Sequence, residues 1–402
     1  MVTMARLHDT VDEILPGIIA DRRFLHENPE LGFQEIKTSK FVAERLASLG
    51  VEDIRTGINQ TGVTGLIRGT GSGAGKDRVV LVRADMDALP ILEAYDVEYK
   101  SQVDGTMHAC GHDAHTAILL GLARVLIDRR DQFAGTVKVL FQPAEELPPG
   151  GAEGMIREGV LDAPHVDAVF GLHMAQDQPV GKVSVGPGPV MAAADGFKIT
   201  IQGKGGHAAY PSYCVDPIVA GAQIIVALQT LVSRETDPTM SAVISTSFFN
   251  SGDAFNVIPD IAELGGTVRT FDPELRTFLQ KRIPELVEGV AASLRAEVDV
   301  VYTLGYPATV NDPAATEIVR EAVREVLGDE HLLVSEPKMG GEDFSYFLNE
   351  RPGAFFFVGS NNEEKGLIWG HHHPRFDIDE ESLGIGLETM AATVTTYLER
   401  GL

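Results

Sequence analysis

Residues 108–115 read His-Ala-Cys-Gly-His-Asp-Ala-His and lead into a predicted helix, Ala114–Leu126. These eight residues hold three histidines, an aspartate and one of the chain's two cysteines. A thiolate with an imidazole two residues to either side offers the sulfur and nitrogen ligands that transition metals prefer. A lone histidine here would more simply cap the helix or pack beneath it. This density of ligands instead favours a metal site that residues further along the chain complete.

The segments around this stretch alternate between predicted helices and strands. Apolar residues at helical spacing predict helices, and short apolar runs predict strands. The predicted helices are Leu7–His26 and Glu35–Leu49, and the predicted strands are Val63–Arg68, Arg78–Arg83, Thr136–Phe141 and Ala168–Leu172. This succession predicts an α/β domain in which helices flank a mixed, twisted sheet. Acidic and histidine residues follow several of these strands, at the sheet edge where open α/β folds bind ligands.

A glycine-rich run, Gly69–Lys76, separates two of the predicted strands. It resembles a phosphate-binding loop, but Thr70 stands where the first glycine is needed and Asp77 replaces the Ser/Thr. A dinucleotide-binding loop would be followed by a helix, whereas a strand follows here. We therefore predict a flexible hairpin loop without a nucleotide site.

The pattern changes after Gly186–Pro189, and 402 residues are too many for one ordinary domain. The order strand, helix, strand, strand, helix, strand predicts a ferredoxin-like α+β unit, with Pro284 kinking or splitting its second helix. Its elements are Gly196–Gly203, Val215–Ser233, Ala242–Phe249, Ala262–Phe271, Pro273–Leu294 and Val298–Leu304. Three α/β segments then resume: Ala314–Leu327, Ala354–Gly359 and Glu380–Leu398. We predict a discontinuous domain, residues 1–188 and 307–402, interrupted by an inserted domain, residues 189–306.

Composition excludes several classes of function. The chain carries a formal net charge of −25, which disfavours nucleic acid and anionic membranes as partners. It contains no run of 18 apolar residues, and residues 1–16 lack the apolar core of a secretory signal. Two cysteines cannot build a disulfide framework. Together these features predict a cytoplasmic protein.

The candidate metal ligands mix oxygen, nitrogen and sulfur donors, which suits Zn²⁺, Mn²⁺, Co²⁺ or Ni²⁺ better than Ca²⁺ or Mg²⁺. They are too many for one four-coordinate ion. Two ions, about 3.5–4 Å apart and sharing a ligand such as a thiolate, would use them. The candidates are Asp85, Asp87, Cys110, His112, Glu145, Glu146, His173 and the run His371–His373.

The adjacent pair Glu145-Glu146 follows a predicted buried strand. Neighbouring side chains in a loop point in different directions, so one carboxylate could bind metal while the other takes a proton from water. A solvated surface pair is the alternative, and the strand before it argues against that. Cys110 could in principle act as a nucleophile, but its surroundings fit a ligand better.

Five motifs in this order resemble the M20 metallopeptidase family. They are Arg83–Pro90, His108–His115, Gln142–Glu146, Gly171–His173 and His372–Asp377. They match its amidohydrolase branch, which contains hippurate hydrolases, N-acyl-L-amino-acid amidohydrolases and auxin-conjugate hydrolases. The resemblance covers essentially the whole chain. It implies a catalytic α/β domain with two metal ions and an inserted lid or dimerisation domain.

The resemblance also implies roles for single residues. Cys110 would bridge the two ions, and Glu145 would be the general base and acid. His112 and His173 would bind one ion, and Glu146 and His372 the other. Asp85 and Asp87 would support the ligands from behind.

Further motifs of the family fall in the predicted inserted domain. Gly203–Ala209 resembles the lid motif whose histidine, His207, binds the scissile carbonyl and, in dimeric members, reaches over from the partner subunit. Asn256 and Arg269 lie in segments that resemble those binding the amide and the terminal carboxylate of the substrate. A fork-shaped guanidinium suits a carboxylate. One departure is Ser212, which stands where relatives commonly have a histidine.

We therefore expect metal-dependent hydrolysis of N-acyl-L-amino acids to a carboxylic acid and a free amino acid. The alternative on the same site is a dipeptidase or an aminopeptidase-like peptidase. A non-catalytic binder would show a broken site, and here every expected ligand and the base are present. The role of the lid predicts a homodimer or a higher homo-oligomer formed through the inserted domain. The acyl group and the native metal stay open.

Overall fold

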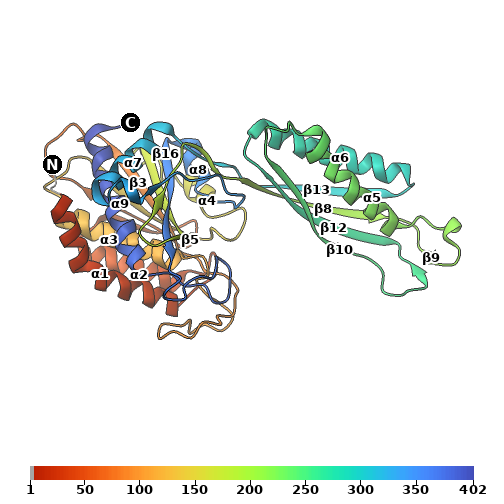
Figure 1. Ribbon diagram of the computed structural model, residues 1–402, viewed down its shortest axis with the longest axis horizontal. Coiled ribbons are helices and arrows are strands. Elements are labelled where there is room, and N and C mark those ends of the chain that lie inside the picture. Colours follow the sequence, from red (N-terminus) through yellow and green to blue (C-terminus); the bar gives the residue numbers. More distant parts are fainter. Residues whose placement is uncertain (1–3) are drawn as a thin grey trace. The chain divides into compact units, whose positions relative to one another are not determined.

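The computed structural model describes residues 4–402 and divides into two compact units (Figure 1). Unit 1 comprises residues up to 190, 310–336 and 343–402, and unit 2 comprises residues 191–309 and 337–342. The short segment 337–342 belongs to unit 2, although we expected residues 307–402 to belong to the larger domain. The expectation about a signal in residues 1–16 lies partly outside the described residues.

Unit 1 is built on an eight-stranded sheet with the order β1-β2-β4-β3-β5-β16-β6-β15. The pairs β4/β3, β3/β5 and β5/β16 are parallel, and β1/β2 and β2/β4 are antiparallel. The sheet is therefore mixed, as predicted. Its strands are β1 (Glu52–Ile58), β2 (Gly62–Arg68), β3 (Val79–Asp85), β4 (Thr136–Gln142), β5 (Ala168–Pro179), β6 (Val183–Ser184), β15 (Leu332–Leu333) and β16 (Gly353–Asn361).

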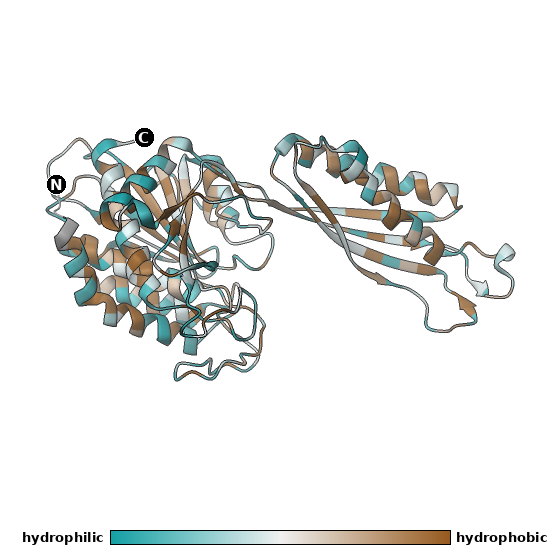
Figure 2. Ribbon diagram, in the orientation of Figure 1, coloured by the Kyte–Doolittle hydropathy of each residue, from teal (hydrophilic) through white to brown (hydrophobic). Residues whose placement is uncertain are grey.

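Helices cover this sheet and complete its core. Helices α3 and α9 contact each other and the central strands, and α1 packs against both. The strands and the inner sides of these helices are apolar (Figure 2), and they form one large buried cluster. The helices of unit 1 are α1 (Met4–Glu27), α2 (Ile36–Leu49), α3 (His112–Asp128), α4 (Ala152–Arg157), α7 (Pro313–Val326), α8 (Ser345–Glu350) and α9 (Glu381–Arg400), with a 3₁₀ turn at η3 (Asp329–His331).

The glycine-rich run is not a hairpin loop, and this prediction was wrong. It connects β2 to β3, but β4 lies between those two strands and pairs with both. The run crosses the start of β4 instead, where the amide of Gly69 donates to the carbonyl of Gly135 (2.9 Å). Sequence neighbours need not be sheet neighbours, because β4 finds its two partners through tertiary contacts.

Strand β5 also differs from its prediction. We expected it to end before His173, but it continues to Pro179, because β16 pairs with it from Val169 to Ala175 and again at Pro179. His173 therefore lies within a strand, directly opposite Phe357 of β16.

Unit 2 forms a four-stranded antiparallel sheet with the order β10-β12-β8-β13. Two strand-helix-strand crossovers with this order define the predicted ferredoxin-like unit. Its elements are β8 (Ala193–Gln202), β9 (Gly206–His207), η1 (Pro211–Tyr213), α5 (Pro217–Thr230), η2 (Leu231–Glu235), β10 (Ala242–Asn250), β11 (Val257–Ile258), β12 (Ile261–Thr270), α6 (Pro273–Ser293) and β13 (Glu297–Tyr306). Two short strands, β7 (Gly188–Met191) and β14 (Thr309–Asn311), pair with each other.

Helices α5, α6 and α7 each begin at an Asp-Pro pair. The carboxylates of Asp216, Asp272 and Asp312 accept backbone N–H groups of the first turn, and the following proline occupies the first helical position. Both choices satisfy or remove donors that a helix start leaves unpaired. Helix α6 runs unbroken through Pro284, so this proline does not split it.

The segment Pro217–Glu235, which contains α5, is long and apolar enough to cross a membrane by length and composition. However, its residues Ala220, Ile224, Leu228 and Leu231 are buried in the core of unit 2. Only 33% of the segment is buried, and Val219 and Val226 on the same helix are exposed.

Candidate metal centre

The parallel strands β3, β4, β5 and β16 direct their carboxyl ends to one edge of the sheet in unit 1. Asp85 ends β3, and Glu145 and Glu146 lie just beyond β4. Cys110 and His112 stand at the start of α3, separated by Gly111 with a φ of 90°. That conformation suits glycine, and it lets the chain turn so that the ligand atoms of both neighbours converge.

Two triplets of potential ligands share the Cys110 thiol. One joins it to His112 and His173, and the other joins it to Glu146 and His372. Within each triplet the ligand atoms lie within 4.8 Å of one another. The distance from the Cys110 Sγ to the His173 Nε2 is 3.6 Å, and that from the His372 Nε2 to the Glu146 Oε1 is 3.0 Å. The sharing of one thiol by two ligand sets is what a bridged dinuclear site requires.

Backbone carbonyls orient the two buried histidines. The Nδ1 of His112 donates to the carbonyl oxygen of Asp87 (2.9 Å), and that of His173 donates to the carbonyl oxygen of Met174 (2.7 Å). This directs each Nε2 toward the ligand cluster. Among the residues that the structure describes, the buried Nε2 of His112 has no hydrogen-bond partner. A buried ring nitrogen left in this way fits a metal ligand.

The electrostatics of the ligand cluster around Cys110 favour a bound cation. Burial, and then the carboxylates of Glu146 and Glu145, raise the pKa of the Cys110 thiol well above its usual value. Burial lowers the pKa of His112, but Asp85 and Asp87 outweigh it and raise that pKa to about 10. A divalent ion would reverse both effects, because its ligands must be deprotonated to bind it. The residues present therefore fit divalent transition metals.

The side chains of Asp85 and Asp87 contact histidines of the cluster. Asp85 Oδ1 lies 2.6 Å from the Nδ1 of His115, and Arg83 donates to Oδ2 (2.7 Å). The Oδ1 of Asp87 is 3.3 Å from the Nδ1 of His112. Both carboxylates are buried with their oxygens engaged by protein groups, so they are built to hold neighbouring groups in place.

Glu145 is 6% exposed and has a carboxylate oxygen within 4.8 Å of ligand atoms of His112 and Glu146. It therefore lies beside the ligand cluster. Its role, like those of the other predicted site residues, stays a proposal.

The three consecutive histidines have different surroundings. His372 faces Glu146, and its amide donates to the carbonyl of Ala109 (2.8 Å). The ring of His371 packs near Phe376 (5.0 Å between centroids), and the ring of His373 stacks on Trp369 (4.2 Å). Of the three, only His372 joins a ligand triplet among the described residues.

The predicted lid residues lie in unit 2. His207 in β9 pairs with Val257 in β11, and the amide of Ala208 donates to the carbonyl of Asn256 (3.0 Å). The structure thus brings His207 and Asn256 side by side. Arg269 lies far along β12, where it donates to the carbonyl of Met339 (3.2 Å).

Sequence reasoning missed two buried charged residues near the site, Arg22 and Glu35, both 0% exposed. Arg22 donates to the carboxylates of Asp113 (2.8 Å) and Asp377 (2.7 Å). A charged residue at a helical spacing is normally solvated, so neither residue carries a signal in a single sequence.

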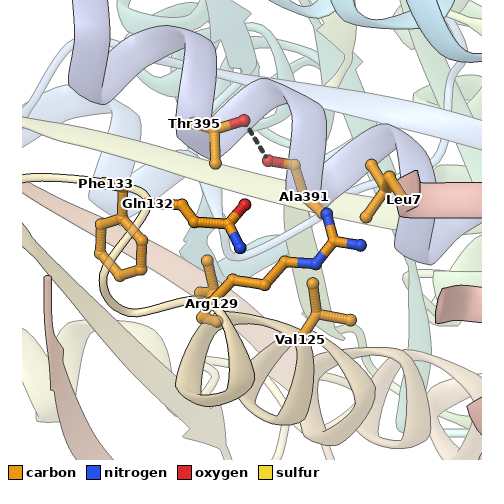
Figure 3. Close-up of a pocket in the computed structure, with 8 residues that line it drawn as sticks. Leu7, Val125, Arg129, Gln132, Phe133, Ala391 and Thr395 are labelled. Carbon is orange, nitrogen blue, oxygen red and sulfur yellow. Dashed lines mark hydrogen bonds between the residues drawn. The ribbon is translucent and has the colours of Figure 1, made fainter. Parts of the chain in front are cut away.

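A separate small pocket in unit 1 contains none of these residues (Figure 3). Its lining is mostly apolar, with Leu7, Val125 and Phe133 prominent, and it offers no cluster of metal ligands or paired carboxylates. It is therefore not a candidate for the reaction site.

Comparison with known proteins agrees with this geometry. The model of peptidase family M20/M25/M40 matches residues 81–396. The chain is 42% identical to IAA-amino acid hydrolase ILR1-like 4 of Arabidopsis thaliana over 99% of this chain and 88% of that protein. It is also 42% identical to thermostable carboxypeptidase 2 of Saccharolobus solfataricus, over 96% of each chain.

Among solved structures, the YXEP protein of Bacillus subtilis is described as a dinuclear metal binding peptidase from the M20 family. It matches with a TM-score of 0.83 and 38% identity, covering 97% of this chain and 99% of that one. Fold, ligand clusters and relatives agree on divalent metal binding. The chain therefore belongs to peptidase family M20/M25/M40 and is a metal-dependent hydrolase.

Proposed function

We propose that this enzyme hydrolyses the amide bond of N-acyl-L-amino acids, releasing a carboxylic acid and a free amino acid. The observation that carries the proposal is the pair of ligand triplets sharing Cys110, with the buried Glu145 beside them. The relative named an IAA-amino acid hydrolase supports this class of substrate.

In the proposed mechanism, Cys110, His112, His173, Glu146 and His372 hold two ions of Zn²⁺, Mn²⁺, Co²⁺ or Ni²⁺. Such ions polarise an amide carbonyl and lower the pKa of water to about 7. Glu145 takes the proton from the attacking water and passes it to the leaving amine. Asn256 binds the substrate amide, His207 stabilises the developing oxyanion, and Arg269 binds the carboxylate of the amino acid.

Chelation provides the first test. Wild-type enzyme assayed on acetyl-, benzoyl- and indoleacetyl-amino acids should lose at least about 99% of its activity when both ions are removed, because water activation depends on them. Readdition of Zn²⁺, Mn²⁺, Co²⁺ or Ni²⁺ should restore hydrolysis and show which ion serves best. Undiminished turnover in protein shown by elemental analysis to be metal-free would rule the mechanism out.

A peptidase acting on free dipeptides or peptide C-termini is the second candidate, because one relative is named a carboxypeptidase. Both reactions release an amino acid with a free carboxylate, so Arg269 serves either. The two candidate substrates differ in the acyl part of the amide, which is a blocking acyl group in one and an amino acid with a free amine in the other. Comparing kcat/KM for N-blocked amino acids with that for the matching free dipeptides separates them, and we expect the N-blocked compounds to be preferred.

We also propose that the enzyme is a homodimer in which the partner subunit supplies His207. The amide of Gly205, in the lid motif, donates to Asp260 (2.7 Å), directly before β12 begins at Ile261. Arg269 is eight steps further along that strand, which at about 3.3 Å per residue is roughly 26 Å. One chain's His207 and Arg269 therefore lie too far apart to hold one small substrate.

Exposed apolar side chains in unit 2 support the dimer. Tyr210, Tyr213 and Phe255, around the lid motif, are 59%, 76% and 101% exposed, and Val219 and Val226 on α5 are 51% and 65% exposed. Strand β10 is also an edge of its sheet, with backbone groups open to pairing. A second copy of this chain could cover both features.

Complementation tests the dimer. Neither His207→Ala nor Glu145→Gln should be active alone, but a co-expressed mixed dimer has one site with both groups intact. Statistical mixing should then restore about a quarter of wild-type activity. Light scattering should report a dimer for both variants. A monomer in solution, or no recovery from a mixed dimer isolated by two different tags, would contradict the arrangement.

We also propose that the protein is cytoplasmic. Cys110 and Cys214 form no disulfide within the described chain, in keeping with a cytoplasmic location.

A further inference from the structure

The turn that carries Glu145 is held by its backbone. Three consecutive amides donate to two buried carboxylates. Ala144 donates to the Oε1 of Glu35 (2.8 Å), Glu145 to the Oδ1 of Asp87 (3.0 Å) and Glu146 to the Oδ2 of Asp87 (2.9 Å). The direction of the Glu145 side chain therefore depends on how these amides are satisfied.

Ala144 adopts a φ of 54°, in the left-handed region. This conformation is unfavourable for an L-residue other than glycine, so surrounding contacts must hold Ala144 there. The hydrogen bond from its amide to Glu35 is such a contact. Gly32 helps, because a Cβ at that position would lie 3.0 Å from the Cβ of Ala144.

Glu35 comes from a distant part of the sequence, immediately before α2. Its second oxygen, Oε2, accepts from the Thr61 hydroxyl (2.6 Å). Burial raises its pKa to about 7, despite the hydrogen bond from Thr61. Burying a carboxyl group is costly unless its oxygens are used, and here both are used, one of them on the catalytic turn.

The segment before Glu35 is also tied to the metal-site loop. The amide of Ala88 donates to the carbonyl of Glu30 (2.8 Å), and Leu31 forms a bridge with Ala88. Residues 30–35 therefore contact both the loop that carries Asp87 and the turn that carries Glu145. The hydrogen bonds of the Glu35 carboxylate go to Ala144 and Thr61 and not to a proposed metal ligand, so its effect should fall on the base and spare the metal.

We propose that Glu35 is a positioning residue, which fixes the backbone of Ala144 and so sets the direction in which Glu145 presents its carboxylate. This proposal rests on the function proposed for Glu145. A misplaced catalytic group of the order of 1 Å can cost about 100-fold in rate. Loss of Glu35 should therefore lower kcat while substrate and metal binding remain.

The test compares Glu35→Leu with Glu35→Gln. Leucine removes the acceptor for the Ala144 amide. Glutamine keeps it, since its amide oxygen can accept from Ala144 while its NH₂ group donates to the Thr61 oxygen. We expect Glu35→Leu to lower kcat about 10- to 100-fold with KM changed less than about threefold, and Glu35→Gln to stay within about threefold of wild type. Metal content by elemental analysis should equal that of wild type in both.

Thr61→Val is the matched control, because it removes the other hydrogen bond of Glu35 without touching Ala144. It should keep kcat within about threefold of wild type. If Thr61→Val and Glu35→Leu lower kcat equally, or if Glu35→Gln is as slow as Glu35→Leu, the positioning role is overturned. Should Glu35→Leu fail to fold, Glu35→Ala removes the same acceptor without adding bulk.

Hydrogen exchange gives a reading that needs no substrate. The Ala144 amide should exchange faster in Glu35→Leu than in wild type or Glu35→Gln, while the amides of α2 stay protected. Unchanged exchange at Ala144 would contradict the proposal even if activity fell. Absence of amide hydrolysis in the wild-type enzyme would instead refute the proposed function, so the two failures are distinguishable.

Discussion

Glu145→Gln should lower kcat for amide hydrolysis by about 10²–10⁴-fold, because glutamine cannot take a proton from water or return it to the leaving amine. Glu145 lies beside the two triplets that share Cys110 and belongs to neither. The variant should therefore bind both ions with wild-type stoichiometry. Steady-state kinetics on an N-acyl amino acid and elemental analysis of the same preparation check both halves of the prediction.

Glu146→Gln is the matched control for this experiment. Glu146 faces His372 across 3.0 Å and belongs to a triplet, so its loss should lower metal occupancy as well as activity. Glu145→Gln should thus lose activity and keep its metal, whereas Glu146→Gln should lose both. A Glu145→Gln enzyme that keeps more than about a tenth of wild-type kcat would remove Glu145 from the mechanism.

Arg22→Met should destabilise unit 1 by about 3–5 kcal/mol, because it leaves buried carboxylates without their cation. The Arg22 side chain is 0% exposed and bridges Asp113, next to His112, and Asp377, in the loop that follows His372. It thereby ties α1 to two segments that carry proposed metal ligands. Denaturant unfolding of the two proteins at neutral pH measures the difference.

Arg23→Met is the control, since Arg23 is the adjacent residue on the same helix. Its side chain is 40% exposed and pairs with Glu380, so its loss should cost less than about 1 kcal/mol. Equal destabilisation by the two substitutions would show that the burial of Arg22 does not account for its contribution to stability.

The destabilisation caused by Arg22→Met should depend on pH. Burial raises the pKa of Asp113, but Arg22 and then His26 outweigh it, so that pKa lies well below its usual value. A depressed pKa contributes stability above the unfolded-state value of about 4, and that stability is lost as the pH falls further. The gap between wild type and Arg22→Met should therefore narrow when unfolding is measured in acid.

The sequence by itself determined the chemistry of the site and the class of the fold. Metal ligands are recognisable by residue type, so the grouping of Cys110 and His112 predicted a transition-metal site with further candidates along the chain. The family resemblance then selected His173, Glu146 and His372 from those candidates. Local patterning predicted the ferredoxin-like unit, because the spacing of apolar residues along a segment distinguishes a helix from a strand. The Asp-Pro starts of its helices are equally local.

Tertiary structure alone decided the order and length of the strands and the partners of the buried charged residues. The insertion of β4 between β2 and β3, and the extension of β5 past His173, depend on pairing with strands that are distant in the sequence. The roles of Arg22 and Glu35 depend on partners 91 and 109 residues away, respectively. A buried charged side chain depends on the protein groups that replace its water, and no local pattern of residues records those partners.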